Sequence, residues 1–166
     1  MAFNKKSKIL QSTNVELDTR KQLLKTFVWS IILYGCETWT ISESDKNALE
    51  AFEMWCFRKM LRIVWTNHVT NETVLNNIGE KRSIITVILK RKAQWIGHVI
   101  RHDCLLHTIL EGAVAGENRR GRPRQEFLDS LIKDLKFTSY TSLKIAALER
   151  TTWRRMCQSL QTNRTG

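Results

Sequence analysis

Residues that interrupt regular secondary structure are scarce in this sequence. The chain of 166 residues contains one proline and seven glycines, below the usual shares of about 5% and 7%. A fold of many short strands needs such residues at its turns, so their scarcity disfavours a β-sandwich or a β-barrel. Because 42% of the residues are hydrophobic, the chain can still bury a globular core. We therefore expect an all-α fold.

The sequence also lacks a disulfide framework and a membrane span. No Cys-x-x-Cys pair occurs among its widely separated cysteines, which are Cys36, Cys56, Cys104 and Cys157. No apolar run approaches the roughly 20 residues of a transmembrane helix, and residues 1–11 lack the apolar stretch and cleavage site of a signal peptide. These absences predict an intracellular protein, nuclear and/or cytoplasmic, that is neither secreted nor bound to a membrane.

Acidic side chains are too few to balance the basic ones. Lys and Arg number 27 against 16 Asp and Glu, which gives a formal net charge of +11 and a pI near 9.9. An excess of this size is typical of proteins that bind a polyanion. We therefore expect DNA, RNA or an RNA–DNA hybrid as the partner. The sequence has no Gly-x-Ser-x-Gly motif, no Walker loop and no paired aspartates that would indicate a catalytic site.

Hydrophobic periodicity predicts about six amphipathic helices. Ser42, followed three residues later by Asp45, is a typical helix start, and Gly79 is a typical helix end. We place the helices at residues 18–34, 43–63, 71–78, 82–101, 125–136 and 142–160. Between the fourth and fifth helices, residues 111–124 have the glycine and arginine content of a loop.

The predicted helix at 82–101 separates apolar from basic side chains. Six basic residues lie between Lys81 and Arg101 with no acidic residue among them, and the apolar side chains share one face. Lys92 falls within the apolar face, where it must snorkel, divide the stripe or meet a ligand. The basic face can bind phosphate, because a bound anion would relieve the mutual repulsion of its cations. The alternative is an ordinary solvated surface.

The segment Arg119-Arg120-Gly121-Arg122-Pro123-Arg124 is the strongest local basic signal. Its guanidinium groups can reach phosphates or enter a narrow minor groove, and its Arg-Gly-Arg-Pro core is similar to that of an AT-hook. A solvated basic loop is the alternative interpretation. The nucleic-acid contacts predicted from the sequence are Lys81, Arg82, Lys90, Arg91, Arg101, Arg119, Arg120, Arg122 and Arg124.

Tryptophan and histidine side chains have both structural and functional interpretations. Most of the six tryptophans fit a packing role, while Trp39 and Trp65, in connecting segments, are the better candidates for stacking on bases. A cluster within ten residues consists of His98, His102, Cys104 and His107. Because structural zinc usually takes two separated ligand pairs, we expect no metal and interpret the histidines as ordinary residues near a helix end.

Four sequence blocks carry a resemblance to a known family. They are Leu33-Tyr34-Gly35-Cys36-Glu37-Thr38-Trp39, Leu49-Glu50-Ala51-Phe52-Glu53-Met54-Trp55-Cys56 with Arg58-Lys59-Met60-Leu61-Arg62-Ile63, Trp95-Ile96-Gly97-His98-Val99-Ile100-Arg101, and Gly121-Arg122-Pro123-Arg124. In this order the blocks resemble the C-terminal part of the reverse transcriptase of non-LTR (LINE-type) retrotransposons. The resemblance spans roughly residues 20–155.

The resemblance implies a helical thumb and a segment beyond it, which in this family grip the template–primer duplex. It places an endonuclease domain and a catalytic palm upstream, with Mg²⁺ at a Tyr/Phe-x-Asp-Asp motif of the palm. Because this sequence lacks that motif and clustered carboxylates, we expect no cofactor and no polymerase activity in this chain by itself. The expected divisions are a basic N-terminal tail (1–12), a thumb-like helical region (13–110), an Arg/Gly-rich loop (111–124) and a C-terminal helical pair (125–166).

Charge, helicity and the resemblance together predict a palm-less fragment of a non-LTR retrotransposon reverse transcriptase. Its expected residual role is sequence-tolerant binding of template–primer nucleic acid. Two alternatives stay open. One is a domesticated helical module that binds a protein partner through its apolar faces, and the other is a translated relic without a selected function.

Overall fold

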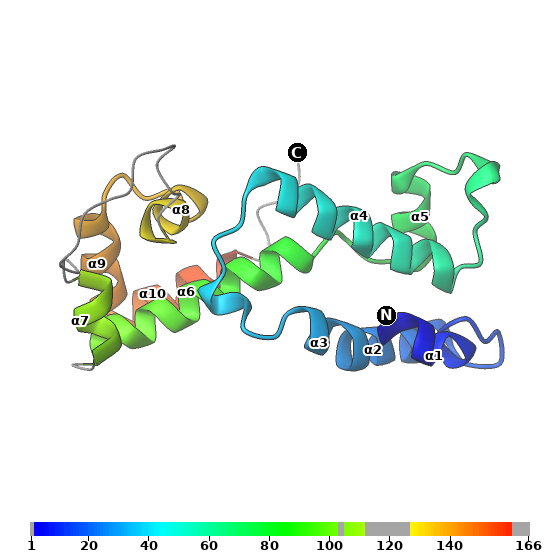
Figure 1. Cartoon of the computed structure of the whole chain (residues 1–166), viewed down its shortest axis with the longest axis horizontal. Coiled ribbons are helices and arrows are strands. Elements are labelled where there is room, and N and C mark those ends of the chain that lie inside the picture. Colours follow the sequence, from blue (N-terminus) through cyan, green and yellow to red (C-terminus); the bar gives the residue numbers. More distant parts are fainter. Residues whose placement is uncertain (1, 103–104, 112–126, 161–166) are drawn as a thin grey trace, which may run out of the picture. The chain divides into compact units, whose positions relative to one another are not determined.

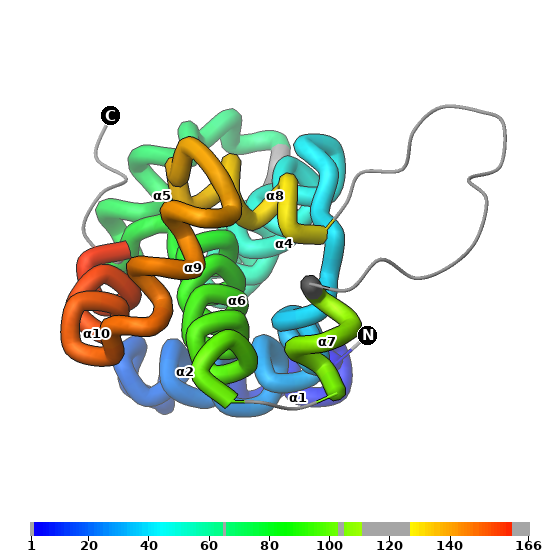
Figure 2. Tube along the Cα trace, turned by 90° about the vertical axis from the view of Figure 1, so that its left-hand side faces the viewer, coloured from blue at the N-terminus to red at the C-terminus, as the bar shows by residue number. Residues whose placement is uncertain are grey.

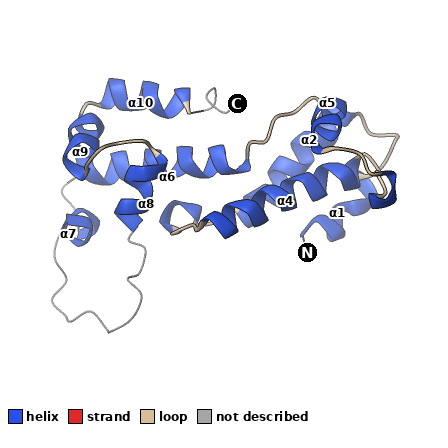
Figure 3. Ribbon diagram, turned by 90° about the horizontal axis from the view of Figure 1, so that it is seen from above, coloured by secondary structure: helices blue, strands red, loops and turns tan. Residues whose placement is uncertain are grey.

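The structure, a computed structural model, describes residues 2–102, 105–111 and 127–160. Every regular element in these ranges is helical and none is a strand (Figure 3). The predicted all-α fold is therefore confirmed. The chain divides into two compact units. Unit 1 comprises Met1–Gly35 and Ser42–Ile85, and unit 2 comprises Cys36–Ile41 and Thr86–Gly166.

Unit 1 is built from helices α1 to α5 (Figure 1). They are α1 (Ala2–Leu10), α2 (Leu17–Leu24), α3 (Ser30–Ile32), α4 (Glu43–Met60) and α5 (Asn71–Ile78), with a π-helical turn at Lys25–Trp29 and a 3₁₀ turn at Trp65–Asn67. The π-helical turn joins α2 to α3, so the helix predicted at 18–34 forms with one wide turn inside it. Helix α1 packs against α2, and α4 packs against α5.

The N-terminal helix α1 lies in the segment expected to be a basic tail. Phe3 and Leu10 are each 1% exposed, whereas Lys5, Lys6 and Lys8 are exposed. Positions 3 and 10 are about two helical turns apart and share a face. With only two buried apolar residues and three lysines among its nine residues, α1 does not show a clear amphipathic pattern in the sequence. Burial of Phe3 and Leu10 holds the segment in place within unit 1.

Local capping residues fix the ends of α4 and α5. The N–H of Asp45 donates to Ser42 Oγ (3.2 Å), and the N–H of Ser42 donates to Asp45 Oδ2 (2.9 Å), which forms a capping box. Hydrogen bonds from Ser42 lower the pKa of Asp45, so they favour its charged form. Helix α5 has the predicted bounds and ends at Gly79, whose φ of +66° favours glycine.

A buried carboxylate caps the start of α6 (Ile84–Arg101). Glu53 of α4 is 0% exposed. Its Oε1 accepts hydrogen bonds from the N–H groups of Ser83 (3.0 Å) and Ile84 (3.2 Å) and from the Ser83 hydroxyl (3.1 Å). A carboxylate is favourable there because the first N–H groups of a helix have no partner within the helix. Burial raises the pKa of Glu53, although these hydrogen bonds oppose the shift.

Unit 2 is organised around α6, which lies beside α9 and α10 (Figure 2). Its other elements are α7 (Leu105–Glu111), α8 (Phe127–Asp134), α9 (Tyr140–Leu148), α10 (Arg150–Ser159) and a 3₁₀ turn at Cys36–Thr38. The buried core of this unit contains Ala93, Ile96, Ile100, Leu131, Leu135, Leu143, Ala147, Trp153 and Cys157. Side chains of α6, α8, α9 and α10 thus enclose one core.

Two features of unit 2 differ from the prediction. The helix expected at 142–160 is divided at Glu149, whose φ of −81° and ψ of 97° are extended. The apolar pattern continues across this break because Leu143 and Trp153 enter the same core, so periodicity alone does not reveal it. Helix α7 was not predicted, because its seven residues hold too short a pattern for the period to be read.

Lys92 is the buried cation of unit 2. It is 1% exposed. Its Nζ donates a hydrogen bond to the carbonyl oxygen of Trp39 and lies 5.4 Å from the centroid of the Phe127 ring. The side chain therefore does not snorkel: its charge is stabilised by a carbonyl dipole and an aromatic face. This contact fixes the segment 36–41 on α6.

Among the helices in the described ranges, none has both the length and the apolar character that crossing a bilayer requires.

Candidate nucleic-acid interface

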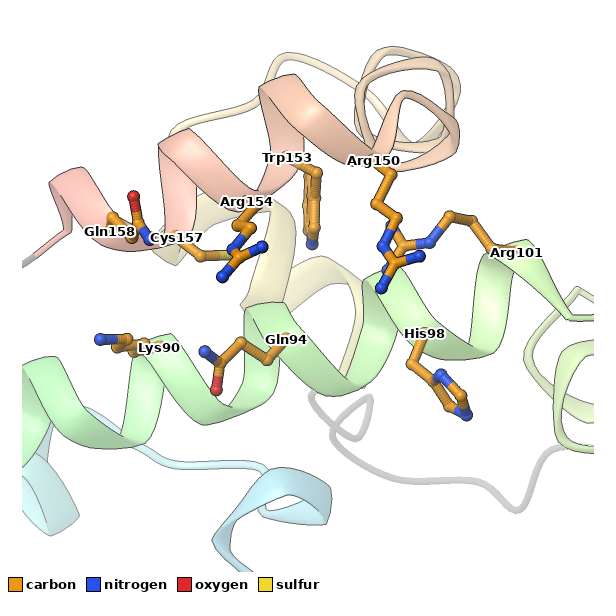
Figure 4. Close-up of a pocket in the computed structure, with 9 residues that line it drawn as sticks. All are labelled: Lys90, Gln94, His98, Arg101, Arg150, Trp153, Arg154, Cys157 and Gln158. Atoms are coloured by element: carbon orange, nitrogen blue, oxygen red, sulfur yellow. The ribbon is translucent and has the colours of Figure 1, made fainter.

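A groove of about 370 Å³ runs between α6 and α10 in unit 2 (Figure 4). We call it the α6–α10 groove. It is lined by Lys90, Gln94, His98 and Arg101 from α6 and by Arg150, Trp153, Arg154, Cys157 and Gln158 from α10. Each wall is polar or basic near the solvent, and Trp153 and Cys157 are buried. Ala93 of α6 and Trp153 of α10 are 60 residues apart along the chain, and a hydrogen bond between them joins the two walls.

Close packing of α6 on α10 depends on Gly97. A Cβ atom added to Gly97 would lie 2.1 Å from Nε1 of Trp153, which is far inside van der Waals contact. The same Nε1 donates a hydrogen bond to the carbonyl oxygen of Ala93 (2.8 Å), and Trp153 is 2% exposed. Glycine at 97 therefore leaves the space that the indole fills. The pair Gly97 and Trp153 sets the separation of the two walls.

Among the described residues that line the groove, four are cations, and they come from two different helices. Lys90 and Arg101 belong to α6, and Arg150 and Arg154 belong to α10. Arg150 and Arg154 are one helical turn apart, and Figure 4 shows them reaching from α10 toward α6 on either side of Trp153. No described residue that lines the groove is acidic, and none of the four cations forms an ion pair with a described residue. The concentrated positive charge attracts an anion.

Arg101 is partly fixed by its neighbours. Its Nη1 donates a hydrogen bond of 2.6 Å to the carbonyl oxygen of Ala147, near the C-terminal end of α9. A guanidinium carries five N–H donors, so further donors stay available for a phosphate oxygen. Arg101 is thereby held at the groove without losing its capacity to bind.

Cys157 supplies no negative charge to the groove. Burial raises the pKa of its thiol, while the nearby charges of Arg101 and Lys90 lower it and do not outweigh burial. The thiol therefore stays protonated near neutral pH. A phosphate group is suited to provide counter-charge for the four cations.

The sequence-predicted contacts are only partly brought together. Lys90 and Arg101 share the groove. Lys81 is exposed in unit 1, and Arg82 pairs with Glu50 (2.8 Å between Nη1 and Oε2). Arg91 lies on another side of α6, 4.0 Å from Glu37. Arg119, Arg120, Arg122 and Arg124 lie outside the described residues, as does Cys104.

The prediction missed Arg150 and Arg154. The apolar pattern of 142–160 places Trp153 and Cys157 on the core side, and Arg150, Arg154 and Gln158 recur every four residues beside it. This spacing was a usable signal. The signal is weak because Arg150 and Arg154 are interleaved with the residues of a core stripe.

The tryptophan of the groove cannot serve as a stacking platform, because Trp153 is 2% exposed. The histidines have a separate arrangement: the rings of His98 and His102 are tilted with centroids 4.3 Å apart. Within the described part of the chain, no three metal-binding side chains gather at one point. The groove thus offers charge and hydrogen-bond donors rather than open aromatic faces.

Comparison of the chain with protein-family models, with curated proteins and with solved structures found no match.

Proposed function

We propose that this chain is the thumb and post-thumb part of a non-LTR retrotransposon reverse transcriptase and that it binds template–primer nucleic acid without reading its sequence. The observation that carries this proposal is the α6–α10 groove, where four cations meet and no described lining residue is acidic. The resemblance supports it too, because the block Trp95–Arg101 contains Gly97, on which the closure of the groove depends.

The mechanism is neutralisation of backbone phosphates. Arg150 and Arg154 on one wall and Lys90 and Arg101 on the other can contact successive phosphates of a strand lying in the groove. Binding releases condensed counterions, so affinity falls as salt rises. Phosphate contacts set position and carry no base information. Sequence-tolerant recognition of DNA, RNA or a hybrid follows from this chemistry.

These residues would position a substrate and would not perform the chemistry. Phosphoryl transfer by two metal ions requires clustered carboxylates. In the proposed family the palm supplies them and holds Mg²⁺. The α6–α10 groove is instead basic, and its part would be to hold the nucleic acid whose end is extended elsewhere.

The test is the salt dependence of duplex binding after both arginines of α10 are removed. We expect Arg150→Ala with Arg154→Ala to lower affinity for a short blunt duplex. The slope of log Kobs against log salt should flatten by about 1.8 if two phosphate contacts are lost. Arg155→Ala is the matched control, because Arg155 is exposed on α10 but does not line the groove. An unchanged slope in the double variant would refute the proposal.

Exposed apolar side chains favour the second candidate, a helical module that binds a protein. Leu105 of α7 is 75% exposed and Ile145 of α9 is 66% exposed. Contiguous apolar patches mark interaction surfaces, and Leu106 and Ile109 of α7 are exposed as well. Size-exclusion chromatography separates the two functions: a nucleic-acid binder changes its elution with duplex at low salt. An interaction module associates with itself or with a protein whether or not duplex is present.

A further inference from the structure

We infer that unit 1 carries a second nucleic-acid site, which takes an unpaired nucleotide by stacking its base on Trp55 and binding its phosphate with neighbouring cations. The site is a groove of about 550 Å³ at the C-terminal end of α4, within the range of roughly 300–1,000 Å³ typical of small-ligand sites. We call it the α4 groove. Its lining includes Trp55, Arg58, Lys59, Arg62, Ile63 and Val64, none of which belongs to the α6–α10 groove.

Trp55 is a rigid aromatic surface that is only partly covered. Phe52 stacks on it with ring centroids 5.8 Å apart, and Phe3 meets it edge-on at 5.1 Å. These contacts hold the indole in one orientation, so a base that stacks on it loses little further entropy of the side chain. Among described residues no partner accepts a hydrogen bond from the indole N–H.

Trp55 also borders a second hollow, of about 410 Å³, together with Arg58. Asn47, Asn71 and Glu50 line this hollow as well. Trp55 therefore borders two hollows of unit 1. Trp153 in unit 2 is, by contrast, enclosed.

Cations stand next to this aromatic surface. Lys59 is exposed, and its Nζ lies 5.9 Å from the Trp55 ring centroid. Arg58 donates from Nη2 to the carbonyl oxygen of Val69 (2.8 Å) and from Nη1 to Asn71 Oδ1 (2.8 Å). No described residue that lines the α4 groove is acidic, and neither cation has a carboxylate partner in the described ranges. A phosphate attached to a stacked base would find both cations within the same groove.

The backbone of Arg62 has an uncommon conformation for a residue other than glycine. Its φ is +56°, in the left-handed region that favours glycine. Nε of Arg62 donates to the carbonyl oxygen of Gln11 (2.8 Å), another residue of the groove lining, and the guanidinium has further N–H donors. A glycine would occupy this position without strain, so a change of Arg62 to glycine removes the guanidinium without disturbing the backbone.

These features select an unpaired nucleotide over a duplex. Bases in a duplex already stack on one another, so a protein indole reaches a base face only where the strand is single or frayed. A basic groove with an open aromatic surface is the usual arrangement for single-stranded nucleic acid, and it tolerates any base because every base has a π-face.

The test compares single-stranded and duplex probes by fluorescence anisotropy with the full chain. For an oligothymidylate of about ten nucleotides, we expect Trp55→Ala to weaken binding between about fivefold and 150-fold, the range measured for loss of one stacked base. Affinity for a blunt duplex should stay unchanged. Trp55→Phe keeps an aromatic face and should retain most of the single-strand affinity.

Arg62→Gly supplies an independent variant that should not unfold the protein. It removes the guanidinium and the backbone strain together, so we expect weaker single-strand binding with an unchanged or higher melting temperature. Arg155→Ala is the matched control, because Arg155 is exposed and lines neither groove, and it should leave single-strand affinity intact. Wild-type single-strand affinity in Trp55→Ala would overturn the inference, and so would an equal loss on both probes. Neither result bears on the α6–α10 groove, which the double arginine variant tests.

Discussion

The two grooves of this protein have similar charge but differ in the position of a tryptophan. In the α6–α10 groove, Trp153 is 2% exposed and serves to join two helices. In the α4 groove, Trp55 stays partly exposed next to Lys59. Positive charge alone attracts any nucleic acid. The two proposed sites differ in the exposure of the tryptophan. A buried tryptophan leaves only backbone phosphates to be bound, whereas a partly exposed one can also stack on an unpaired base.

The two units also differ in the sign of the charge that each one buries. Unit 1 buries Glu53, whose carboxylate caps α6. Unit 2 buries Lys92, whose ammonium group holds the carbonyl of Trp39. In both units a buried charge connects segments far apart in the sequence, because unpaired backbone groups at these points would otherwise be costly.

The largest effect is expected from Glu53→Ala. It leaves the N–H groups of Ser83 and Ile84 without their acceptor, and each buried donor left unpaired costs about 1–3 kcal/mol. We expect the free energy of unfolding to fall by about 3 kcal/mol or more, measured by urea denaturation followed by circular dichroism. The matched variant Glu72→Ala, on an exposed position of α5, should change it by about 0.5 kcal/mol or less. Equal losses of unfolding free energy in the two variants would mean that the Glu53 cap does not stabilise the fold.

Gly97→Ala is expected to have the next largest effect and to distinguish the functions of the two grooves. The added Cβ collides with Trp153, and such overpacking costs about 1–3 kcal/mol. Duplex binding should weaken because the walls move apart, and it should weaken more than oligothymidylate binding, which also uses the α4 groove. In a Trp153→Ala background the same substitution should be neutral or stabilising, since alanine favours helix over glycine. An additive double-mutant cycle would contradict this account of the closure.

A smaller effect is expected from the titration of Glu53. Burial raises its pKa in the folded state, so the protonated carboxyl is favoured by folding. The stabilisation that this provides is fully present below the pKa of the unfolded chain and is lost as pH rises through the folded pKa. Relative to Glu53→Gln, which does not titrate, the wild type should lose stability between acid and neutral pH. Urea midpoints of both proteins across this range would show it, and parallel curves would exclude it.

The smallest effect is expected from Arg82→Ala. Arg82 is a predicted nucleic-acid contact, but its guanidinium pairs with Glu50 at a partly exposed position. Surface pairs of this kind contribute about 0–1 kcal/mol. We expect duplex affinity to change far less than in Arg150→Ala, both measured by anisotropy at the same salt. A larger loss for Arg82→Ala would shift the proposed interface toward unit 1.

Several elements were predictable because their causes are local. The capping box of Ser42 and Asp45 and the stop at Gly79 act within one or two helical turns, so α4 and α5 follow directly from the sequence. Lys90 and Arg101 were correctly placed on one helix. The sequence did not predict their partners in the groove, Arg150 and Arg154, because these residues are far away along the chain. They belong to α10, and the apolar pattern does not show that this helix begins after Glu149.

Composition and periodicity by themselves determined that the chain is helical and strongly basic and where its locally capped helices begin and end. Only the tertiary structure decided which cations face one another, which tryptophan is enclosed and where the buried charges Glu53 and Lys92 find their partners. The physical reason is that periodicity assigns a side chain to one face of its own helix. The helix packed opposite is chosen by close contacts, such as Trp153 in the space left by Gly97.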